Sequence, residues 1–222
     1  MLPTIIPLSG IDGAGKDTVL EYFIEFAEEH NLTYAVVQEP GGCEVGREIR
    51  KLLKSPMFEI DRDTETLLFA ASRASNLANL PTDVDIIFYN RWYLCSLGYQ
   101  VYGREPDRYK AYQYFKSTWL PLVQMSGVLD LEQHQVITVA PVEESLQRAL
   151  GREEKCRLEQ FDIDFYKRSQ EAMLNTDMSK YSKDPKAITK YVIENYSTLD
   201  DLKINARKVF LEIMDNSGLT HA

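Results

Sequence analysis

Hydrophobic residues gather in short runs along the chain, separated by turn residues. The runs have the length of β-strands and occur at 4–8 (TIIPL), 33–38 (TYAVVQ), 84–89 (VDIIFY), 135–139 (QVITV) and 190–194 (KYVIE). The run at 84–89 is almost continuously apolar, which is typical of a strand buried on both faces of a parallel sheet. The pattern therefore predicts five strands.

Between the strands, apolar residues recur at helical spacing, as Leu67, Ala71 and Ala74 do. The segments predicted to be helical are 16–29, 45–54, 63–79, much of 93–126, a stretch from 142, 161–175 and 199–215. Ser197 and Asp200 can cap the last of these helices.

Strands that alternate with helices form a parallel sheet with helices on both faces. We therefore expect an α/β fold built on a doubly wound, five-stranded parallel sheet. No internal repeat or linker divides the sequence, so residues 1–222 are expected to form a single domain. Ligands bind beyond the carboxyl ends of the strands in such sheets. Gly10, Glu39 and Asn90 each stand at the end of a predicted strand.

The composition narrows the classes of partner. The 222 residues are 44% hydrophobic and 27% charged, as in ordinary globular proteins, and the formal charge of −9 disfavours binding to nucleic acid. Cys43, Cys95 and Cys156 lie far apart without metal-ligand spacing, which suits unpaired thiols in a reducing compartment. No apolar run approaches the roughly 20 residues of a membrane span, and the N-terminus lacks the basic start of a signal peptide. We expect a cytoplasmic location, without a nucleic-acid or membrane partner.

The segment from Gly10 to Lys16 reads G-x-x-x-x-G-K and lies between a predicted strand and a predicted helix. Its glycines let backbone N–H groups turn inward around phosphate oxygens, and Lys16 would hold the β- and γ-phosphates of ATP. The motif predicts a P-loop NTPase-type fold; the alternative is a glycine-rich turn without a ligand. The residues expected to bind ATP are Gly10, Asp12, Gly13, Ala14, Gly15, Lys16, Asp17 and Thr18.

Asp17 stands where the motif normally has a serine or threonine, whose hydroxyl ligates Mg²⁺ beside the nucleotide. A carboxylate is itself a good Mg²⁺ ligand, so we expect Asp17 to contact the metal directly or through water. The neighbouring Thr18 has a hydroxyl, but it points about 100° away around the helix. A carboxylate that only caps the N-terminus of the helix is the alternative.

Five segments together resemble the thymidylate kinase family, whose members move the γ-phosphoryl group of ATP to dTMP. They are SGIDGAGK at 9–16, EPGGCEVGREIRKLL at 39–53, LLFAASRASNL at 67–77, YNRWYLCSLGYQ at 89–100 and TVAPVEESLQRALGREEKCRLEQFDIDFYKRSQEAML at 138–174. The similarity covers about 4–215, and five motifs in the family's order are a specific signal. It implies ATP and Mg²⁺ as cofactors, dTMP as acceptor and a homodimer. The helices at 63–79 and 93–102 are the interface candidates.

The resemblance also assigns roles at the acceptor site. Arg73 and Arg91 would grip the monophosphate of the acceptor, since a guanidinium fork suits phosphate oxygens. Phe69 would stack on the base, and Asp12 would contact the 3′-hydroxyl of the sugar. The residues expected to bind the acceptor are Asp12, Glu39, Arg50, Phe69, Arg73, Arg91, Ser96, Tyr99 and Gln100. The alternatives are solvated surface charges for the arginines and core packing for Phe69.

A charged segment at about 150–160 is similar to the lid of the family's bacterial-type enzymes, which carry the catalytic arginine there. Closure of such a lid would exclude water from the site. Arg152, Lys155 and Arg157 lie in this segment, and Glu159 would orient Arg157 or contact the substrate. The alternative is a solvated helix with i,i+4 ion pairs. The residues expected to act in catalysis are Lys16, Arg91, Arg152 and Arg157.

The chain departs from the family's motifs around this pocket. Asn90 replaces the aspartate of the motif D-R-[YFH], and Trp92 replaces its aromatic residue, usually tyrosine. Ser9 and Cys43 replace a glutamate and a threonine. We hypothesise that Asp17 supplies the carboxylate that position 90 has lost. These changes suit a shifted substrate or a divergent lineage, such as a viral enzyme.

Two other functions remain open from the sequence. A deoxynucleoside kinase shares the loop and lid, and it needs a carboxylate at the end of the second strand to deprotonate a nucleoside hydroxyl; Glu39 stands there. A nucleotide-binding paralogue without turnover would explain Asp17 and Asn90. The retained Arg73 and Arg91 argue against that paralogue, because a protein released from catalysis has little reason to keep them.

Overall fold

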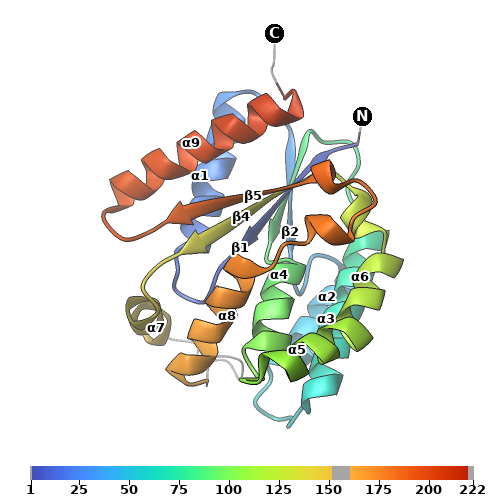
Figure 1. Cartoon of the computed structure of the whole chain (residues 1–222). Helices are drawn as coiled ribbons and strands as arrows, with labels where there is room; N and C mark the ends of the chain where they lie inside the picture. Colours follow the sequence, from blue (N-terminus) through green and yellow to red (C-terminus); the bar gives the residue numbers. More distant parts are fainter. Residues whose placement is uncertain (1, 152–160, 220–222) are drawn as a thin grey trace.

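The computed structural model describes residues 2–151 and 161–219. Within this part of the chain, five parallel strands form one sheet in the order β2-β3-β1-β4-β5 (Figure 1). The strands are β1 (Thr4–Ser9), β2 (Tyr34–Gln38), β3 (Ile86–Asn90), β4 (Gln133–Val139) and β5 (Ile188–Glu194). The expected doubly wound α/β fold is confirmed.

Helices cover both faces of this sheet. Their bounds are α1 (Lys16–Glu29), α2 (Glu44–Lys54), α3 (Arg62–Ala78), α4 (Tyr93–Ser96), η1 (Leu97–Tyr102), α5 (Arg108–Tyr114), η2 (Phe115–Trp119), α6 (Leu120–Met125), η3 (Val128–Asp130), α7 (Val142–Leu150), α8 (Ile163–Asn175), η5 (Ser179–Tyr181), η6 (Pro185–Ala187) and α9 (Leu199–Ser217). The segments η1 and η2 are π-helical, and the other η segments are short 3₁₀ turns.

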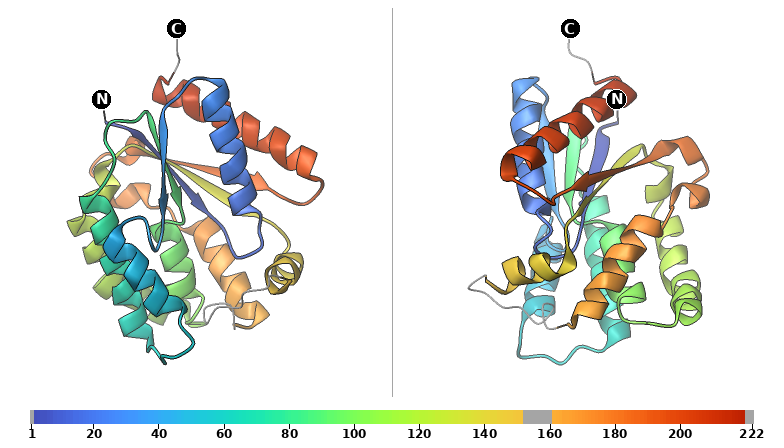
Figure 2. Two further views of the ribbon diagram at one scale, coloured as in Figure 1. Left: turned by 180° about the vertical axis from the view of Figure 1, so that it is seen from behind. Right: turned by 60° about the vertical axis from the view of Figure 1, so that its left-hand side comes forward.

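The helices form two layers around the sheet. Figure 2 shows α1 and α9 together on one face, while α3, α4, α5 and α8 lie on the opposite side. Phe23 and Phe26 of α1 meet Phe210 of α9, with ring centroids 5.4 and 5.8 Å apart. Both layers bury apolar side chains against the sheet, and this burial is the main favourable contribution to folding.

The register of the strands brings three functional segments level with one another. Leu8 and Gln38 both lie beside Asn90 in the sheet. The backbone N–H of Glu39 donates to the Asn90 carbonyl at 2.9 Å, and that of Arg91 donates to the Leu8 carbonyl at 3.0 Å. The residues that follow β1, β2 and β3 therefore meet at one edge of the sheet, as the sequence predicts.

The start of β4 differs from the prediction. The strand begins at Gln133 rather than at 135, because Gln133 and His134 are polar residues that the fold buries. The side-chain oxygen of Gln133 accepts a hydrogen bond from the Trp92 indole at 3.0 Å and another from the Tyr93 hydroxyl at 3.2 Å. Paired in this way, a polar residue can occupy a core position that a hydrophobicity pattern does not identify.

The cap of α9 also differs from the prediction. Thr198 is the N-cap, and its hydroxyl accepts from the Asp201 N–H at 3.2 Å. The Asp201 carboxylate accepts in return from the Thr198 N–H at 3.3 Å. This capping box, rather than Ser197 and Asp200, starts the helix.

The helix predicted at 93–102 is not an interface, and that prediction is wrong. Every residue from Tyr93 to Val101 is buried within the chain. The hydroxyl of Ser169 in α8 donates to the Gly98 carbonyl at 3.1 Å, so α8 lies directly against this segment. The helix predicted at 63–79, which is α3, still has an exposed face.

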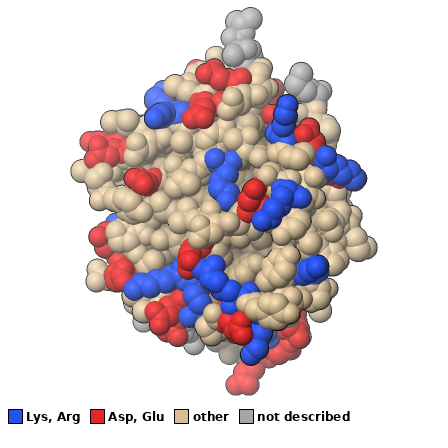
Figure 3. All heavy atoms as spheres, in the orientation of Figure 1, with Lys and Arg blue, Asp and Glu red and all other residues tan. Residues whose placement is uncertain are grey.

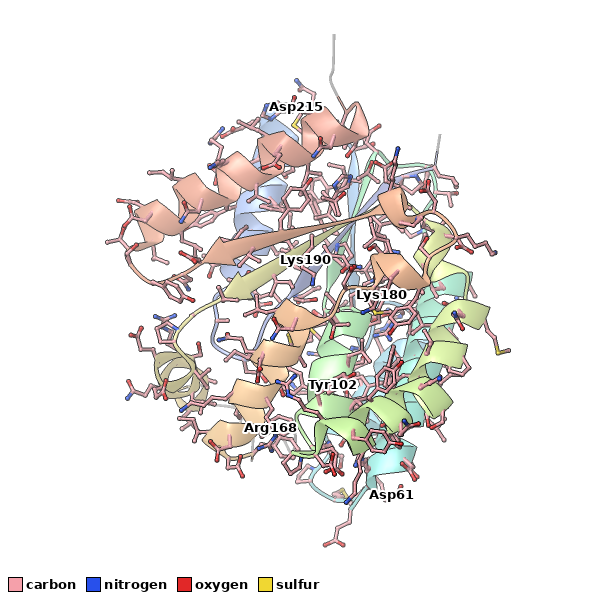
Figure 4. The ribbon with its side chains drawn as sticks, in the orientation of Figure 1. Asp61, Tyr102, Arg168, Lys180, Lys190 and Asp215 are labelled. Atoms are coloured by element: carbon pink, nitrogen blue, oxygen red, sulfur yellow. The ribbon has the colours of Figure 1, made fainter. Side chains whose placement is uncertain are left out.

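Charged side chains join α8 to its neighbours (Figure 4). Arg168 donates from Nε to the Gly103 carbonyl at 2.9 Å, just beyond η1. Lys190 of β5 reaches the C-terminal end of α8, where its Nζ donates to the Leu174 carbonyl at 3.1 Å. These contacts fix α8, and with it the segment 93–102, relative to the sheet.

Acidic and basic side chains are interspersed on the face of the molecule drawn in Figure 3. Among the residues that the structure describes, no helix is long and apolar enough to cross a membrane.

Candidate functional site

The phosphate loop leaves β1 at Gly10 and ends at Lys16, the first residue of α1. Gly13 has a φ of 77°, and a Cβ there would lie 1.9 Å from the carbonyl oxygen of Ser145 in α7. Gly15, with a φ of 97°, is the N-cap of α1. Because glycine tolerates this left-handed backbone, the loop can curl and turn N–H groups inward, as a phosphate cradle requires.

Two side chains outside the predicted site hold this loop in place. Asn195, which follows β5, donates from Nδ2 to the Ala14 carbonyl at 2.9 Å. Arg148 of α7 donates to the Gly13 carbonyl at 3.4 Å and pairs with Glu144. Asn195 stands one residue past a strand end, and that position is the signal that can identify it from the sequence.

Lys16 is buried where the loop meets the end of β3. Its Nζ lies 2.5 Å from Oδ1 of Asp17 and 2.5 Å from Oδ1 of Asn90. The Nδ2 of Asn90 also donates to Oδ1 of Asp17 at 3.0 Å. Asp17 and Asn90 therefore contact both Lys16 and each other, as the hypothesis of a relocated carboxylate requires.

This contact affects the pKa values of Asp17 and Lys16. Burial alone would raise the pKa of the Asp17 carboxyl, but the Lys16 ammonium and hydrogen bonds from Lys16 and Asn90 lower it to about 2. The carboxyl is therefore ionised at neutral pH. Burial, reinforced by the charge of Arg91, lowers the pKa of Lys16, and Asp17 opposes this effect.

Asp12, Arg91 and Tyr99 form a second cluster beside the lysine. The guanidinium of Arg91 pairs with the Asp12 carboxylate and lies 5.4 Å from the centre of the Tyr99 ring. The Tyr99 hydroxyl donates to the Asp12 carboxylate at 3.0 Å and accepts from the Asp12 N–H at 2.9 Å. Burial alone would lower the pKa of Arg91, but Asp12 and Tyr99 raise it, so the guanidinium is charged.

Arg73 and Glu39 form a buried pair in the inner wall of the site. Nε and Nη2 of Arg73 donate to Oε2 of Glu39 at 2.9 and 2.6 Å, and Nη2 also donates to the Ser96 hydroxyl at 3.0 Å. The guanidinium lies 5.6 and 5.2 Å from the ring centres of Trp92 and Trp119. Burial raises the pKa of Glu39, and Arg73 opposes this effect. Arg73 is therefore not a solvated surface charge.

The remaining acceptor candidates complete the wall. Gln100 donates from Nε2 to Oε1 of Glu65 at 3.3 Å. Arg50 donates from Nη1 to the Pro40 carbonyl at 2.9 Å. Phe69 of α3 is half-buried and faces the same cavity, so it is not wholly taken up by core packing.

Two cavities open around these residues. The loop hollow, of about 350 Å³, is lined by the phosphate loop, by Arg148 and by Asn195. The strand-end hollow, of about 500 Å³, is lined by every residue expected to bind the acceptor: Asp12, Glu39, Arg50, Phe69, Arg73, Arg91, Ser96, Tyr99 and Gln100. The residues that line both hollows are Asp12, Lys16, Asp17 and Arg91. The two cavities thus meet at the phosphate loop, and we call this place the junction.

Some expected residues lie elsewhere. Gly10 and Ala14 shape the loop without lining the loop hollow, whereas Thr18 lines it. The lid residues Arg152, Lys155, Arg157 and Glu159 fall within 152–160, outside the described residues.

Comparison with known proteins extends over most of the chain. The family model for thymidylate kinase matches residues 8–183. A thymidylate kinase of Carboxydothermus hydrogenoformans is 31% identical over 176 residues, which are 76% of this chain and 81% of that protein. One of Chlorobaculum tepidum is 34% identical over 75% of this chain and 80% of that protein. One of Kosmotoga olearia is 28% identical over 96% of this chain and 98% of that protein.

Solved structures share the fold. A thymidylate kinase of Candida albicans superposes with a TM-score of 0.64 at 18% identity, covering 97% of this chain and 93% of that one. One of Ehrlichia chaffeensis gives a TM-score of 0.58 at 21% identity, covering 96% and 97%. With the phosphate loop, the two meeting hollows and the match over 8–183 taken together, this chain belongs to the thymidylate kinase family.

Proposed function

We propose that the protein transfers the γ-phosphoryl group of ATP to dTMP, which gives ADP and dTDP. One observation carries the proposal: the loop hollow and the strand-end hollow meet at Lys16 and Arg91. Phosphoryl transfer needs little covalent work from a protein, but it does need two nucleotides held in line and positive charge where phosphate charge develops. The two hollows could hold the two nucleotides, and Lys16 and Arg91 at the junction would supply the positive charge between them.

In this proposal the loop hollow binds ATP. The backbone N–H groups of the phosphate loop and the start of α1 would hold the phosphates. Lys16 would exchange its contacts with Asp17 and Asn90 for β- and γ-phosphate oxygens. Asn195 and Arg148 would keep the loop in the required shape through their hydrogen bonds to its carbonyls. The roles expected for Arg152 and Arg157 stay predictions from the sequence.

The strand-end hollow would bind dTMP. Arg91 lies at the junction, where Asp12 and Tyr99 fix its guanidinium, so we assign it to the acceptor monophosphate. Arg73 lines only the strand-end hollow and is held by Glu39 deep in its wall. Its position therefore favours contact with the base, not the monophosphate contact expected from the sequence.

Mg²⁺ suits the chemistry of the junction. The Asp17 carboxylate is half-exposed and ionised, and the Asn90 amide oxygen lies within the same cluster; both are oxygen ligands of the kind that Mg²⁺ prefers. Within 2–151 and 161–219, no group of three or more His, Cys, Asp or Glu side chains could hold a metal ion. Asp17 and Asn90 would thus hold the ion together with phosphate oxygens and water. Bound there, it would neutralise phosphate charge.

We further propose a homodimer that packs through α3. The exposed face of this helix carries an apolar stripe of Leu67, Ala71, Ala74 and Ala78. Small side chains at helical spacing let two helices approach closely. The described strands all join one sheet, which supports a single domain over 1–222. The free thiols of Cys43 and Cys95 support a cytoplasmic location.

The proposal is tested by ATP-dependent ADP release with a panel of acceptors: dTMP, dUMP, dCMP, dAMP and thymidine. We expect turnover with dTMP, and loss of turnover by about a hundredfold or more in Lys16→Ala, because a cation at the γ-phosphate is removed. The matched control is Lys203→Ala, which removes a partly exposed lysine of α9 that pairs with Glu25 of α1 and lines neither hollow, so the rate should stay unchanged.

Other outcomes would point to other functions. Turnover with thymidine but not with dTMP would identify a deoxynucleoside kinase. Glu39 gives that reading little support, because Arg73 already holds its carboxylate in the wall. ATP binding by calorimetry without ADP release from any acceptor, at any Mg²⁺ concentration, would indicate a nucleotide-binding protein and contradict the proposal.

A further inference from the structure

We propose that Glu65 and Arg104 set the base preference of the strand-end hollow by fixing the orientation of the Gln100 side-chain amide. The inference rests on the function proposed above and adds two positioning residues to it. Neither Glu65 nor Arg104 lines the hollow, whereas Gln100 does. The pair would therefore act on the acceptor only through Gln100.

Glu65 is a carboxylate without exposed surface, in the first turn of α3. It forms an ion pair with Arg104, which follows η1, and its Oε1 accepts from Nε2 of Gln100 at 3.3 Å. Arg104 also lies 4.9 Å from the ring centre of Phe161, a residue that lines the hollow. Burial of a carboxylate is unfavourable unless it is paired and hydrogen-bonded, so a buried acid in this place needs a reason.

The chemistry of the pair dictates which way the amide of Gln100 points. A carboxylate held by a guanidinium accepts hydrogen bonds and has none to donate. Only the NH₂ group of Gln100 can therefore face Glu65. The carbonyl oxygen of Gln100 is left to face the hollow, where it is an acceptor for a group on the ligand.

Arg73 supplies the complementary donor on the same wall. Its Nη1 is buried and has no hydrogen-bond partner among the described residues, although Nε and Nη2 are engaged by Glu39. Arg73 and Glu65 lie one helical turn after and one turn before Phe69 on the buried side of α3. A base that stacks on Phe69 would thus have its edge between a donor from Arg73 and an acceptor from Gln100.

This donor and acceptor match the imide edge of a 2,4-dioxopyrimidine, which offers a carbonyl oxygen beside a ring N–H. Cytosine presents the opposite pattern, an amino group beside a ring nitrogen acceptor, so its amino group would face the arginine. As long as Glu65 stays a paired carboxylate, the Gln100 amide cannot turn over to accommodate cytosine. Glu65 and Arg104 would thereby favour thymine or uracil over cytosine.

The test is Glu65→Gln, which keeps the shape of the side chain and lets position 65 donate as well as accept. The Gln100 amide can then flip and offer its NH₂ group to the ligand. We expect the ratio of kcat/KM for dTMP to that for dCMP to fall about tenfold, the size of one hydrogen bond gained or left unmade. The KM for ATP should stay unchanged. Asp63→Asn, which removes an exposed carboxylate from the same helical turn, is the matched control and should keep the parent ratio.

If Glu65 acted in folding alone, Glu65→Gln would lower kcat/KM for dTMP and for dCMP by the same factor and leave their ratio unchanged. That result would overturn the inference. If Glu65→Gln does not fold, Gln100→Leu decides, because it removes the amide through which Glu65 would act and keeps a side chain of similar size in the wall of the hollow. The ratio should then fall as well, and an unchanged ratio in folded Gln100→Leu would likewise overturn the inference. Failure of the proposed function is a distinct result, since it appears in the parent protein as absence of ADP release with dTMP.

Discussion

Asp17 has a carboxylate where the family's motif has a hydroxyl, Asn90 has an amide where it has a carboxylate, and the structure brings the two side chains into contact. Both side chains bind Lys16 Nζ at 2.5 Å, so the lysine lies between a carboxylate and an amide. A family-like arrangement would have a hydroxyl after the lysine and a carboxylate at the end of β3. The charge beside Lys16 is therefore the same in both arrangements, and only its position along the chain differs.

This relocation predicts the outcome of a double substitution. Asp17→Ser should lower kcat/KM about tenfold or more, because it removes the carboxylate that would hold the metal. Asp17→Ser combined with Asn90→Asp should recover much of that loss, since the carboxylate returns to the end of β3. The measurement is steady-state kinetics together with the Mg²⁺ concentration that gives half-maximal rate. Equal rates for the single and the double variant would contradict the relocation.

The sequence predicted single residues best where a motif specifies them. Lys16, Asp12 and Arg91 lie at the junction because loop, strand and helix place them there. Contacts between residues could not be predicted from the sequence. Glu39 and Arg73 are both expected to bind the ligand, but in the structure they also form an ion pair with each other. Such pairs are formed by elements distant in the sequence, and residue type alone does not reveal them.

At the scale of elements, the π-helical segment η1 places Tyr99 and Gln100 in the wall of the strand-end hollow and lies against α8. A Cβ on Gly98 would come within 2.7 Å of Cε of Met173 and 2.9 Å of the Ser169 carbonyl oxygen in α8. A side chain has no room there, because a backbone atom of α8 is one of the two neighbours. The close approach of the two segments therefore depends on glycine.

Gly98→Ala should accordingly destabilise the fold and disturb the acceptor site. We expect the free energy of unfolding to fall by about 1–3 kcal/mol, the usual range for an overpacked core. The KM for dTMP should rise, because Tyr99 and Gln100, which follow Gly98 directly, line the strand-end hollow. Thermal melts and two-substrate kinetics measure these effects. Gly151→Ala, whose Cβ would meet no atom nearer than 3.5 Å, is the control for stability; equal melting shifts in the two variants would contradict the argument.

The C-terminal end of α9 is joined to the sheet through His134. Its Nε2 lies 3.0 Å from the Ser217 hydroxyl and 3.3 Å from Oε1 of Glu132, and Nδ1 lies 3.3 Å from the Tyr191 hydroxyl. Burial lowers the pKa of His134, and Glu132 opposes this effect. The folded state therefore binds its proton less readily than the unfolded chain, whose histidine has a pKa near 6.5.

This difference predicts how stability depends on pH. The contribution of neutral His134 is present above pH 6.5 and is lost as the pH falls toward the lowered pKa of the folded state. Between pH 7.5 and 5, the melting temperature should therefore drop by a few degrees more in the parent than in His134→Gln, which keeps hydrogen bonds without a titrating group. His30→Gln is the matched control, and its melting temperature should drop between pH 7.5 and 5 by as much as that of the parent. Identical pH profiles for the parent and His134→Gln would rule this contribution out.

For the whole molecule, the topology was the most predictable property. Alternating strands and helices leave few ways to build a parallel sheet, and the carboxyl ends of its strands must share an edge. The strand-end hollow therefore lies where the sequence pattern predicts a ligand site, beyond the carboxyl ends of the strands. The surface was harder to predict: the same apolar spacing on α3 that predicted a helix does not tell which apolar residues face the core and which face solvent.

That ambiguity bears on assembly. Leu67 of α3 has 55% of its surface exposed, and Ala71, Ala74 and Ala78 continue the exposed stripe. The opposite side of the helix is buried and carries Arg73 in the wall of the strand-end hollow. A partner packed on the stripe would thus support the helix whose other side lines the strand-end hollow.

Ala71→Arg places a long charged side chain in the middle of this stripe and should prevent a second chain from packing there, because its charge would have to be desolvated. We expect a two-chain mass for the parent and a one-chain mass for the variant in sedimentation experiments. The KM for dTMP should rise severalfold in the variant while the melting temperature falls, since α3 loses its support on one side. Ile204→Arg, at a site on α9 that is 66% exposed, is the matched control and should stay dimeric. A parent protein that sediments as one chain, or an Ala71→Arg variant that remains a dimer, would show that this face of α3 is not the interface.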